Sequence, residues 1–282
     1  MVEVPVIDIG EWPGFTRRLV SGPSGPLSVR IGGAADGAVV LLNHSILTSS
    51  AIWRRQAERL AARGYRVVCL DSRGHGHSPA SAAPYAMADL VADNIAVLDA
   101  LSVDRAHYVG VSQGGMTGLG LGIGHADRLF SLCICAARAD APAPFAAGWD
   151  DRIAVASGKG VQALAIPTAE RWFGAAFLEA HPQEAQALLS CIAETSVEGF
   201  IGCAQAIQGL DYLANLGRIT TPTMLLIGSR DETLLQPMRD LQPMISNARL
   251  SVIEDAGHLP QIDQPDSFDS LLFARLSEVM SA

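Results

Sequence analysis

Short apolar runs alternate along the chain with longer stretches of helical periodicity. The runs are mostly continuous rather than alternating, which is typical of parallel strands buried on both faces. They lie at residues 38–42, 66–70, 107–110, 129–134, 223–227 and 249–253. The helical stretches lie at residues 53–63, 86–101, 234–245 and 267–280. This alternation predicts a doubly wound, mostly parallel α/β sheet.

Two segments depart from this alternation. Residues 15–20 and 27–31, joined by a Gly- and Pro-rich segment, predict an antiparallel hairpin that leaves residues 1–14 as an N-terminal extension. After the sixth strand the runs stop, and residues 138–217 show short helical pieces rich in Ala, Trp and Phe. We interpret this insertion as a helical cap between two parts of one core, residues 1–137 and 218–282, because caps bury substrates and exclude water.

Composition narrows the classes of partner. With 49% hydrophobic residues the 282-residue chain can bury a large core, and its net charge of −9 argues against nucleic acid and anionic membrane surfaces. No apolar run reaches the roughly 18 residues that span a bilayer, and the N-terminus lacks the pattern of a secretory signal. We therefore expect a cytoplasmic protein that acts on a small molecule; a homo-oligomer is compatible with the sequence.

The cysteines predict no metal site. Neither a C-x-x-C motif nor a Cys/His cluster with the spacing of zinc ligands is present. The number of cysteines is odd, so we expect them to be small apolar side chains of the core in a reducing compartment. They are Cys69, Cys133, Cys135, Cys191 and Cys203.

The most informative motif is Gly110-Val-Ser112-Gln-Gly114, a G-x-S-x-G pattern. It follows a predicted strand and opens a predicted helix. A serine at such a sharp turn projects its hydroxyl away from the backbone, and small flanking residues let the chain make the turn. This setting makes Ser112 the candidate nucleophile.

A nucleophilic serine needs a base, and the base needs an acceptor that orients it. Two later loops supply both, because Asp231 follows the strand at residues 223–227 and His258 follows the strand at residues 249–253. All three side chains then lie beyond the carboxyl ends of strands, where open α/β sheets bind ligands. Strand position favours Asp231 over Asp140, and the neighbouring carboxylates Glu232 and Asp255 are further competitors.

Two backbone amides are candidates for an oxyanion hole. One is that of Gln113, directly after the serine; the other is that of Ile46, in the loop after the strand at residues 38–42. His44 in the same loop is interpreted as a residue that orients the loop without transferring protons. Asp71 and Arg73, in the glycine-containing turn after the next strand, are expected to brace that turn.

Several motifs together carry a family resemblance. They are Asp71-Ser-Arg-Gly-His-Gly76, Gly110-Val-Ser-Gln-Gly-Gly115, Ala136-Ala-Arg138, Glu170-Arg-Trp-Phe173, Glu198-Gly-Phe-Ile-Gly-Cys-Ala-Gln-Ala206 and Ala256-Gly-His258. From about residue 27 onward the chain resembles α/β-hydrolases and, among them, 3-oxoadipate enol-lactonases. The resemblance implies the α/β-hydrolase fold and cofactor-free opening of a small, carboxylated enol-lactone. In that reaction Ser112 attacks, His258 acts as base and Asp231 orients it.

A carboxylated substrate calls for a local cation, since the protein's net charge is negative. Arg138, where the sheet passes into the cap, is the first candidate, with Arg171 and Arg152 as alternatives. Trp149 and Trp172 are expected to line the substrate pocket. The same triad would also serve a carboxylesterase, another lactonase or a C–C bond hydrolase, and a slow-turnover ligand sensor on the same scaffold is a further alternative.

Overall fold

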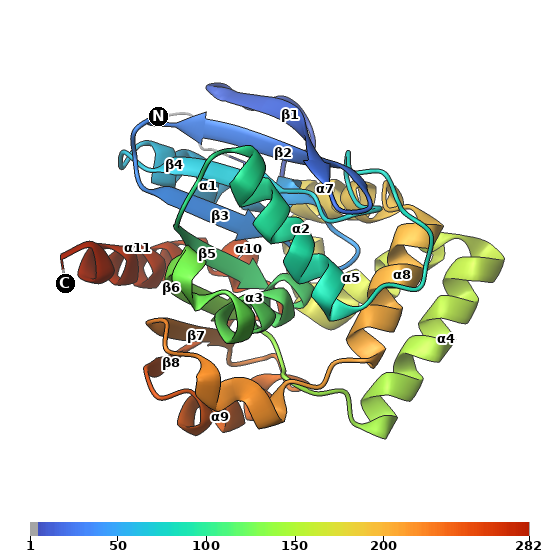
Figure 1. Cartoon of the computed structure of the whole chain (residues 1–282). Helices are drawn as coiled ribbons and strands as arrows, with labels where there is room; N and C mark the ends of the chain where they lie inside the picture. The colour runs from blue at the N-terminus through green and yellow to red at the C-terminus, as the bar shows by residue number, and fades with distance from the viewer. Residues whose placement is uncertain (1–4, 282) are drawn as a thin grey trace.

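A computed structural model describes residues 5–281, and its centre is one eight-stranded sheet (Figure 1). The strands lie in the order β1-β2-β4-β3-β5-β6-β7-β8. Their bounds are β1 Phe15–Gly22, β2 Gly25–Gly33, β3 Val39–Asn43, β4 Arg66–Leu70, β5 Ala106–Val111, β6 Leu129–Cys135, β7 Thr223–Gly228 and β8 Ala248–Ile253. The β1–β2 and β2–β4 pairs are antiparallel and the others parallel, as the doubly wound prediction and the predicted hairpin require.

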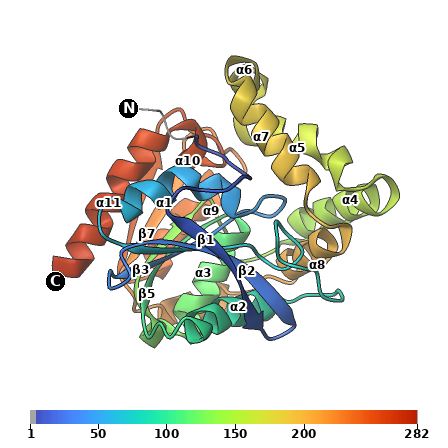
Figure 2. The ribbon, with the colours of Figure 1, turned by 90° about the horizontal axis from the view of Figure 1, so that it is seen from above.

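Helices cover both faces of the sheet. Their bounds are α1 Arg54–Ala61, α2 Met87–Ala100, α3 Gln113–Gly124, α9 Leu235–Leu241, α10 Pro260–Asp263 and α11 Pro265–Ser281. Seen from above, α1 and α11 lie on one side of the sheet and α2 and α3 on the other (Figure 2). Strands β3, β5 and β7 are buried along their whole length, which explains why their sequences are continuously apolar.

The register of the parallel strands aligns the ends that carry the candidate triad. Val111 pairs with Cys135, Cys135 pairs with Leu226, and Gly228 pairs with Ile253. The carboxyl ends of β5, β7 and β8 therefore lie along one edge of the sheet, and the loops that follow them meet above it.

Helices and their loops connect β6 to β7, and these helices lie together beyond that edge (Figure 2). They are α4 Ala143–Lys159, α5 Ala165–Phe173, α6 Ala175–Ala180, α7 Pro182–Ala193 and α8 Val197–Gln208. Short pieces were expected here, but α4 is a single helix of 17 residues that begins after Pro142 and ends before Gly160. Within residues 5–281 no single helix is long and apolar enough to cross a membrane. Among these residues only α7 and α8 taken together have the length and composition of a membrane span, and they are bent by 92° relative to each other.

The glycines of α3 allow the helix to pack closely on its neighbours. A Cβ at Gly118 would lie 2.6 Å from the side chains of Tyr108 and Ile134, and one at Gly120 would lie 2.6 Å from Tyr212. Each glycine costs helix stability of about 1 kcal/mol relative to alanine. Alanine at Gly118 would clash with side chains of β5 and β6, and alanine at Gly120 with Tyr212, so the glycines let α3 lie close to the elements it packs on.

The N-terminal extension is anchored by a buried tryptophan; its first four residues lie outside the described part of the chain. Trp12 is 2% exposed, and the guanidinium groups of Arg30 and Arg54 lie 4.4 and 5.5 Å from its ring centroid. Arg54 also pairs with Asp8 at 2.9 Å, and the Asp8 amide donates to the Ala51 carbonyl oxygen. The extension thus packs on the segment that follows the candidate oxyanion loop.

Truncating this anchor should destabilise the protein. We expect Trp12→Ala to lower the free energy of unfolding in urea by about 3 kcal/mol, the usual cost of removing a buried tryptophan side chain. Leu19→Ala is the control, because Leu19 is 64% exposed and should change little. Equal stability of both variants and the wild type would mean that the extension does not anchor the fold.

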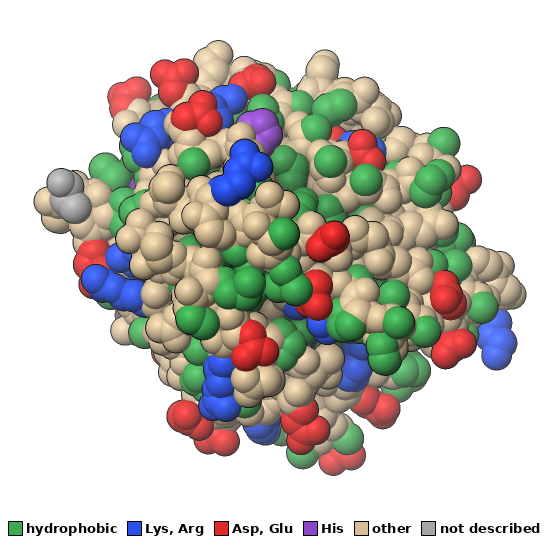
Figure 3. All heavy atoms as spheres, turned by 60° about the horizontal axis from the view of Figure 1, so that its bottom comes forward, with side chains coloured by type: hydrophobic (Ala, Val, Ile, Leu, Met, Phe, Trp, Pro, Cys, Tyr) green, Lys and Arg blue, Asp and Glu red, His purple; other side chains and the backbone are tan. Residues whose placement is uncertain are grey.

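On one face of the molecule the charged side chains of both signs are mixed (Figure 3). Figure 3 shows acidic and basic side chains interspersed with apolar ones on one face of the molecule. All five cysteines are free and buried, and no group of three or more His, Cys, Asp or Glu side chains among residues 5–281 could hold a metal ion. Because the net charge is −9 and the face in Figure 3 has no basic patch, an anionic substrate would have to be attracted by individual side chains inside a cavity.

Candidate active site

Ser112 sits at a strained turn between β5 and α3. Its backbone has φ 58° and ψ −117°, a positive φ that non-glycine residues rarely adopt. The turn is tight, since a Cβ at Gly110 would lie 2.2 Å from the Gly114 carbonyl oxygen and one at Gly114 would lie 2.5 Å from that of Asn43. The Ser112 amide donates to the Cys135 carbonyl oxygen at 2.8 Å. These contacts hold the serine where it lines a cavity under the cap.

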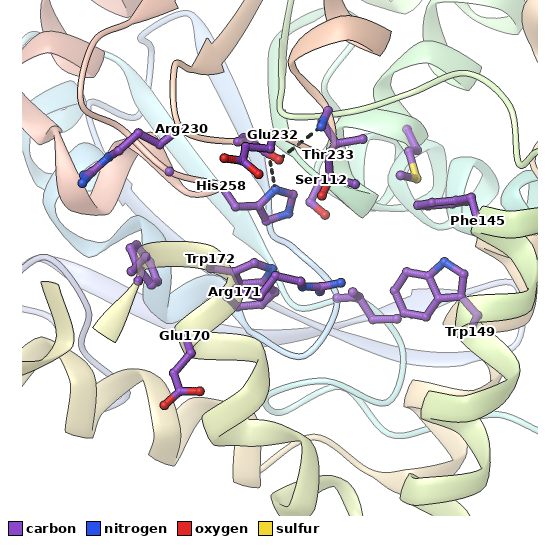
Figure 4. Close-up of a pocket in the computed structure, with 17 residues that line it drawn as sticks. Ser112, Phe145, Trp149, Glu170, Arg171, Trp172, Arg230, Glu232, Thr233 and His258 are labelled. Atoms are coloured by element: carbon purple, nitrogen blue, oxygen red, sulfur yellow. Dashed lines mark hydrogen bonds and ion pairs between the residues drawn. The ribbon is translucent and has the colours of Figure 1, made fainter. Parts of the chain in front are cut away.

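His258 and Asp231 form a hydrogen-bonded pair beside that serine. His258 Nδ1 lies 2.7 Å from Asp231 Oδ2 (Figure 4). Burial by itself would raise the pKa of Asp231, but the His258 ring, the Leu234 amide and Arg171 together hold that pKa below its usual range. An ionised Asp231 can only accept, so Nδ1 carries the proton and Nε2 of a neutral ring is left as an acceptor.

The other candidate carboxylates lie elsewhere. Asp140 pairs with Arg138 at 2.9 Å, and Asp255 is exposed on the loop before His258. Glu232 lines the cavity but makes no ion pair with His258 within the described residues. Asp231 is thus the carboxylate that the structure brings to the histidine.

Two backbone amides near Ser112 are available to a ligand. Gln113 is the first residue of α3, and Ile46 lines the same cavity as Ser112 and His258. Among the hydrogen bonds of residues 5–281, none uses the N–H of Gln113 or of Ile46. The geometry therefore leaves both predicted oxyanion donors free.

His44 holds the oxyanion loop through its ring. Its Nε2 accepts the Ser72 amide N–H at 2.8 Å, which leaves Nδ1–H to donate to the Ser45 carbonyl oxygen, also at 2.8 Å. Burial lowers the pKa of His44, so the ring stays neutral. Both nitrogens are occupied by backbone groups, as expected for a residue that orients the loop.

Asp71 and Arg73 brace neighbouring segments, but not each other. Asp71 Oδ1 accepts the Ser50 amide N–H at 2.8 Å, which ties the segment after the oxyanion loop to this turn. Arg73 makes two bonds of 2.7 Å to Asp93 on α2. Both residues brace their surroundings as expected, but the expectation that they are each other's partners was wrong, since each bonds to another element.

A cavity of about 350 Å³ opens between the sheet edge and the cap. Ser112 and His258 lie at its sheet side, and its walls include aromatic side chains from α4 and α5 (Figure 4). These are Phe145, Trp149, Trp172 and Phe173. The predicted pocket residues Trp149 and Trp172 thus both line it, and Trp172 also stacks on His258 with 5.5 Å between ring centroids.

Arg138 does not reach the cavity, contrary to the sequence prediction. Its guanidinium pairs with Asp140, two residues along the chain, and lies 4.3 Å from the ring centroid of Phe145. Its charge is therefore neutralised locally. Two arginines line the cavity: Arg171, one of the two alternatives, and Arg230, which donates to the Asp255 carbonyl oxygen.

Arg171 and Arg152 are cations that lack a carboxylate partner at ion-pair distance within residues 5–281. Arg171 is exposed to the cavity, and in Figure 4 its side chain extends toward Trp149. The surrounding protein lowers its pKa by desolvation, which Asp231 partly offsets. Burial and the charge of Arg171 lower the pKa of Arg152 to about 9. Within residues 5–281 no Asp or Glu oxygen lies within 4.0 Å of either guanidinium.

The Arg152 guanidinium lies over the Trp149 ring, 4.4 Å from its centroid, and donates to Thr168 Oγ1. Its Nη1 is buried without a protein partner among the described residues. The repulsion between Arg152 and Arg171 and the unpaired Nη1 of Arg152 both cost free energy, and a bound anion would reduce this cost. The arrangement can hold a carboxylate in the cavity.

Residues 38–265 match a protein-family model described as "alpha/beta hydrolase fold". The chain belongs to the α/β-hydrolase family. It is a hydrolase, and the resemblance carried by its motifs is confirmed by its relatives.

Two relatives and one solved structure show the range of this similarity. "3-oxoadipate enol-lactonase 1" of Acinetobacter baylyi is 32% identical over 86% of this chain and 90% of its own. "Putative carbamate hydrolase RutD" of Variovorax paradoxus is 31% identical over 90% of this chain and 97% of its own. The crystal structure of the enol-lactonase from Burkholderia xenovorans LB400 superimposes with a TM-score of 0.88 at 29% identity, over 92% of this chain and all of that one.

Proposed function

We propose that this hydrolase opens a small lactone that bears a free carboxylate, an enol-lactone such as 3-oxoadipate enol-lactone, through an acyl-enzyme on Ser112. The observation that carries the proposal is that Arg171 lines the same cavity as Ser112 and His258. A second cation, Arg152, is near enough to Arg171 for the charge of Arg171 to lower its pKa. A cavity of about 350 Å³ suits a compact substrate. The enol-lactonase relatives support the same substrate class.

The proposed reaction uses the Asp231–His258 hydrogen bond and the position of Ser112 in the same cavity as His258. His258 Nε2 takes the Ser112 hydroxyl proton while Oγ attacks the lactone carbonyl carbon, and Asp231 stabilises the imidazolium that forms. The negative oxygen of the tetrahedral intermediate is bound by the Ile46 and Gln113 amides.

Collapse of this intermediate breaks the ring C–O bond. The leaving enolate oxygen takes the proton from His258, and the enol becomes a ketone. Water then attacks the acyl-enzyme with His258 again as base, which releases the dicarboxylic product and restores Ser112. Every proton and electron pair is accounted for by these three residues and water.

The decisive assay compares substrates that differ in charge. We expect the ultraviolet absorbance of 3-oxoadipate enol-lactone to fall with a kcat of at least ~1 s⁻¹. An enol-lactone with the same ring but no carboxylate should have a kcat/KM about 10²-fold lower, because it cannot bind Arg171. Cleavage of p-nitrophenyl acetate through Ser112 without turnover of either lactone would rule out the enol-lactonase assignment and favour a general carboxylesterase.

Carbamate hydrolysis is the second candidate, favoured by the relative from Variovorax paradoxus. The same serine chemistry would release an amine in place of the enolate. A panel of small carbamates assayed for amine release separates the two proposals, because the enzyme should prefer one class in kcat/KM.

A further inference from the structure

The turn that carries His258 is held from two sides. Trp172, in the cap, accepts the His258 backbone N–H on its carbonyl oxygen at 2.9 Å. On the other side, Asp263 Oδ2 accepts the Gly257 N–H at 2.6 Å. A Cβ at Gly257 would lie 2.0 Å from the Trp172 carbonyl oxygen, so the turn is pressed against the cap and only glycine fits. Any movement of the Gly257 amide would therefore move the imidazole.

The carboxylate of Asp263, below the Gly257 amide, is in an environment that disfavours its charge. It ends α10, is largely surrounded by protein, and its Oδ1 is buried without a hydrogen-bond partner among the described residues. Burial raises its pKa to about 6, although the Gly257 amide and the charge of Arg230 oppose the shift. No Lys, Arg or His nitrogen of residues 5–281 forms an ion pair with it.

A buried carboxylate with one unsatisfied oxygen lowers stability relative to a neutral side chain of the same shape. Folding alone thus does not explain an acid at this position. The contact that Asp263 does make is with the residue before the candidate base, and the short N–H···O distance fits a charge-assisted bond.

We propose that Asp263 is a positioning residue, whose Oδ2 fixes the Gly257 amide and thereby sets the His258 ring between Asp231 and Ser112. The inference rests on the proposed triad. Asp263 is not among the residues that line the cavity, so it acts through the turn and not on the substrate.

Two substitutions separate the contact from the charge. Asp263→Ala removes the acceptor, and we expect kcat for p-nitrophenyl acetate at pH 8 to fall on the order of 10²-fold, as for a misplaced catalytic group. KM should change less than about 3-fold, because the cavity wall is intact. Asp263→Asn keeps an acceptor oxygen for the Gly257 N–H and should restore kcat to within roughly 5-fold of wild type.

Glu254→Gln is the matched control, since Glu254 is exposed on the same loop and should leave kcat unchanged. The proton on His258 Nδ1 gives an independent readout by NMR. Its signal should persist in Asp263→Asn and be lost or displaced in Asp263→Ala. Thermal unfolding shows whether each variant is folded, and Asp263→Asn should melt above the wild type at pH 8 because it removes a buried charge.

The proposal is overturned if Asp263→Ala keeps the wild-type kcat. It is also overturned if both variants lose kcat equally while the His258 proton signal stays in place. Failure of the enol-lactone assignment would appear only in the lactone assay, because p-nitrophenyl acetate reports on the turn through Ser112 itself. Failure of the triad would appear as ester cleavage that survives Ser112→Ala.

Discussion

Replacing Ser112 by alanine is expected to lower kcat for the enol-lactone, or for whichever ester the enzyme accepts, by roughly 10⁵-fold or more. The Oγ atom is the group that forms the covalent bond, so no neighbouring side chain replaces it. Fold and affinity should persist, because the side chain is small and the turn is held by the Gly110 and Gly114 contacts with the backbone. Rates are followed by the absorbance of the lactone or of p-nitrophenolate.

Covalent trapping makes this prediction specific. Wild-type enzyme quenched with acid during p-nitrophenyl acetate turnover should carry an acetyl group on the peptide that contains Ser112. Ser190→Ala, in the cap helix α7, is the control and should behave as wild type. A Ser112→Ala enzyme with normal turnover, or an acetyl group found on another residue, would remove Ser112 from the mechanism.

The sheet could be predicted from the sequence because its strands are buried on both faces. Continuous apolar runs of strand length, such as those of β3, β5 and β7, indicate buried parallel strands when helices separate them. The candidate triad followed from topology, since Ser112, Asp231 and His258 come after strand ends that parallel pairing brings to one edge.

The cap was harder because its longest helix, α4, lacks a strong separation of polar and apolar faces. Helix α4 was expected as short pieces, although Pro142 before its first residue and Gly160 after its last are ordinary start and stop signals. Glycine is required at the second point, where φ is +80°. These signals could have identified one long helix.

The choice of Arg138 as substrate cation failed for a local reason. Its position where the sheet meets the cap was correctly inferred, but Asp140 two residues later neutralises it. Arg171 forms no ion pair within the described chain, although the charge of Asp231 acts on it, and that difference becomes visible only when the cap is folded. Asp263 was missed because nothing in its sequence context shows that its carboxylate is packed beneath the Gly257 amide.

Because Arg171 lines the cavity without an ion-pair partner in the described chain, its replacement is expected to cause a large loss of kcat/KM. Arg171→Met keeps most of the apolar stem but removes the guanidinium. We expect kcat/KM for the carboxylated enol-lactone to fall about 10²-fold, the usual cost of removing one partner of a charged hydrogen-bonded pair. For p-nitrophenyl acetate, which bears no charge, kcat/KM should change less than about 3-fold. The loss should reside mainly in KM, because the carboxylate is bound alike in the ground and transition states.

Arg138→Met is the matched control, since this arginine lies nearer the sheet and is paired with Asp140. It should lower kcat/KM for both substrates equally or not at all. A loss confined to the carboxylated substrate in Arg138→Met would restore the sequence-based choice, whereas equal losses for both substrates in Arg171→Met would give Arg171 a structural role. Adding Arg152→Met to Arg171→Met should lower the affinity little further, because Arg152 is not among the residues that line the cavity.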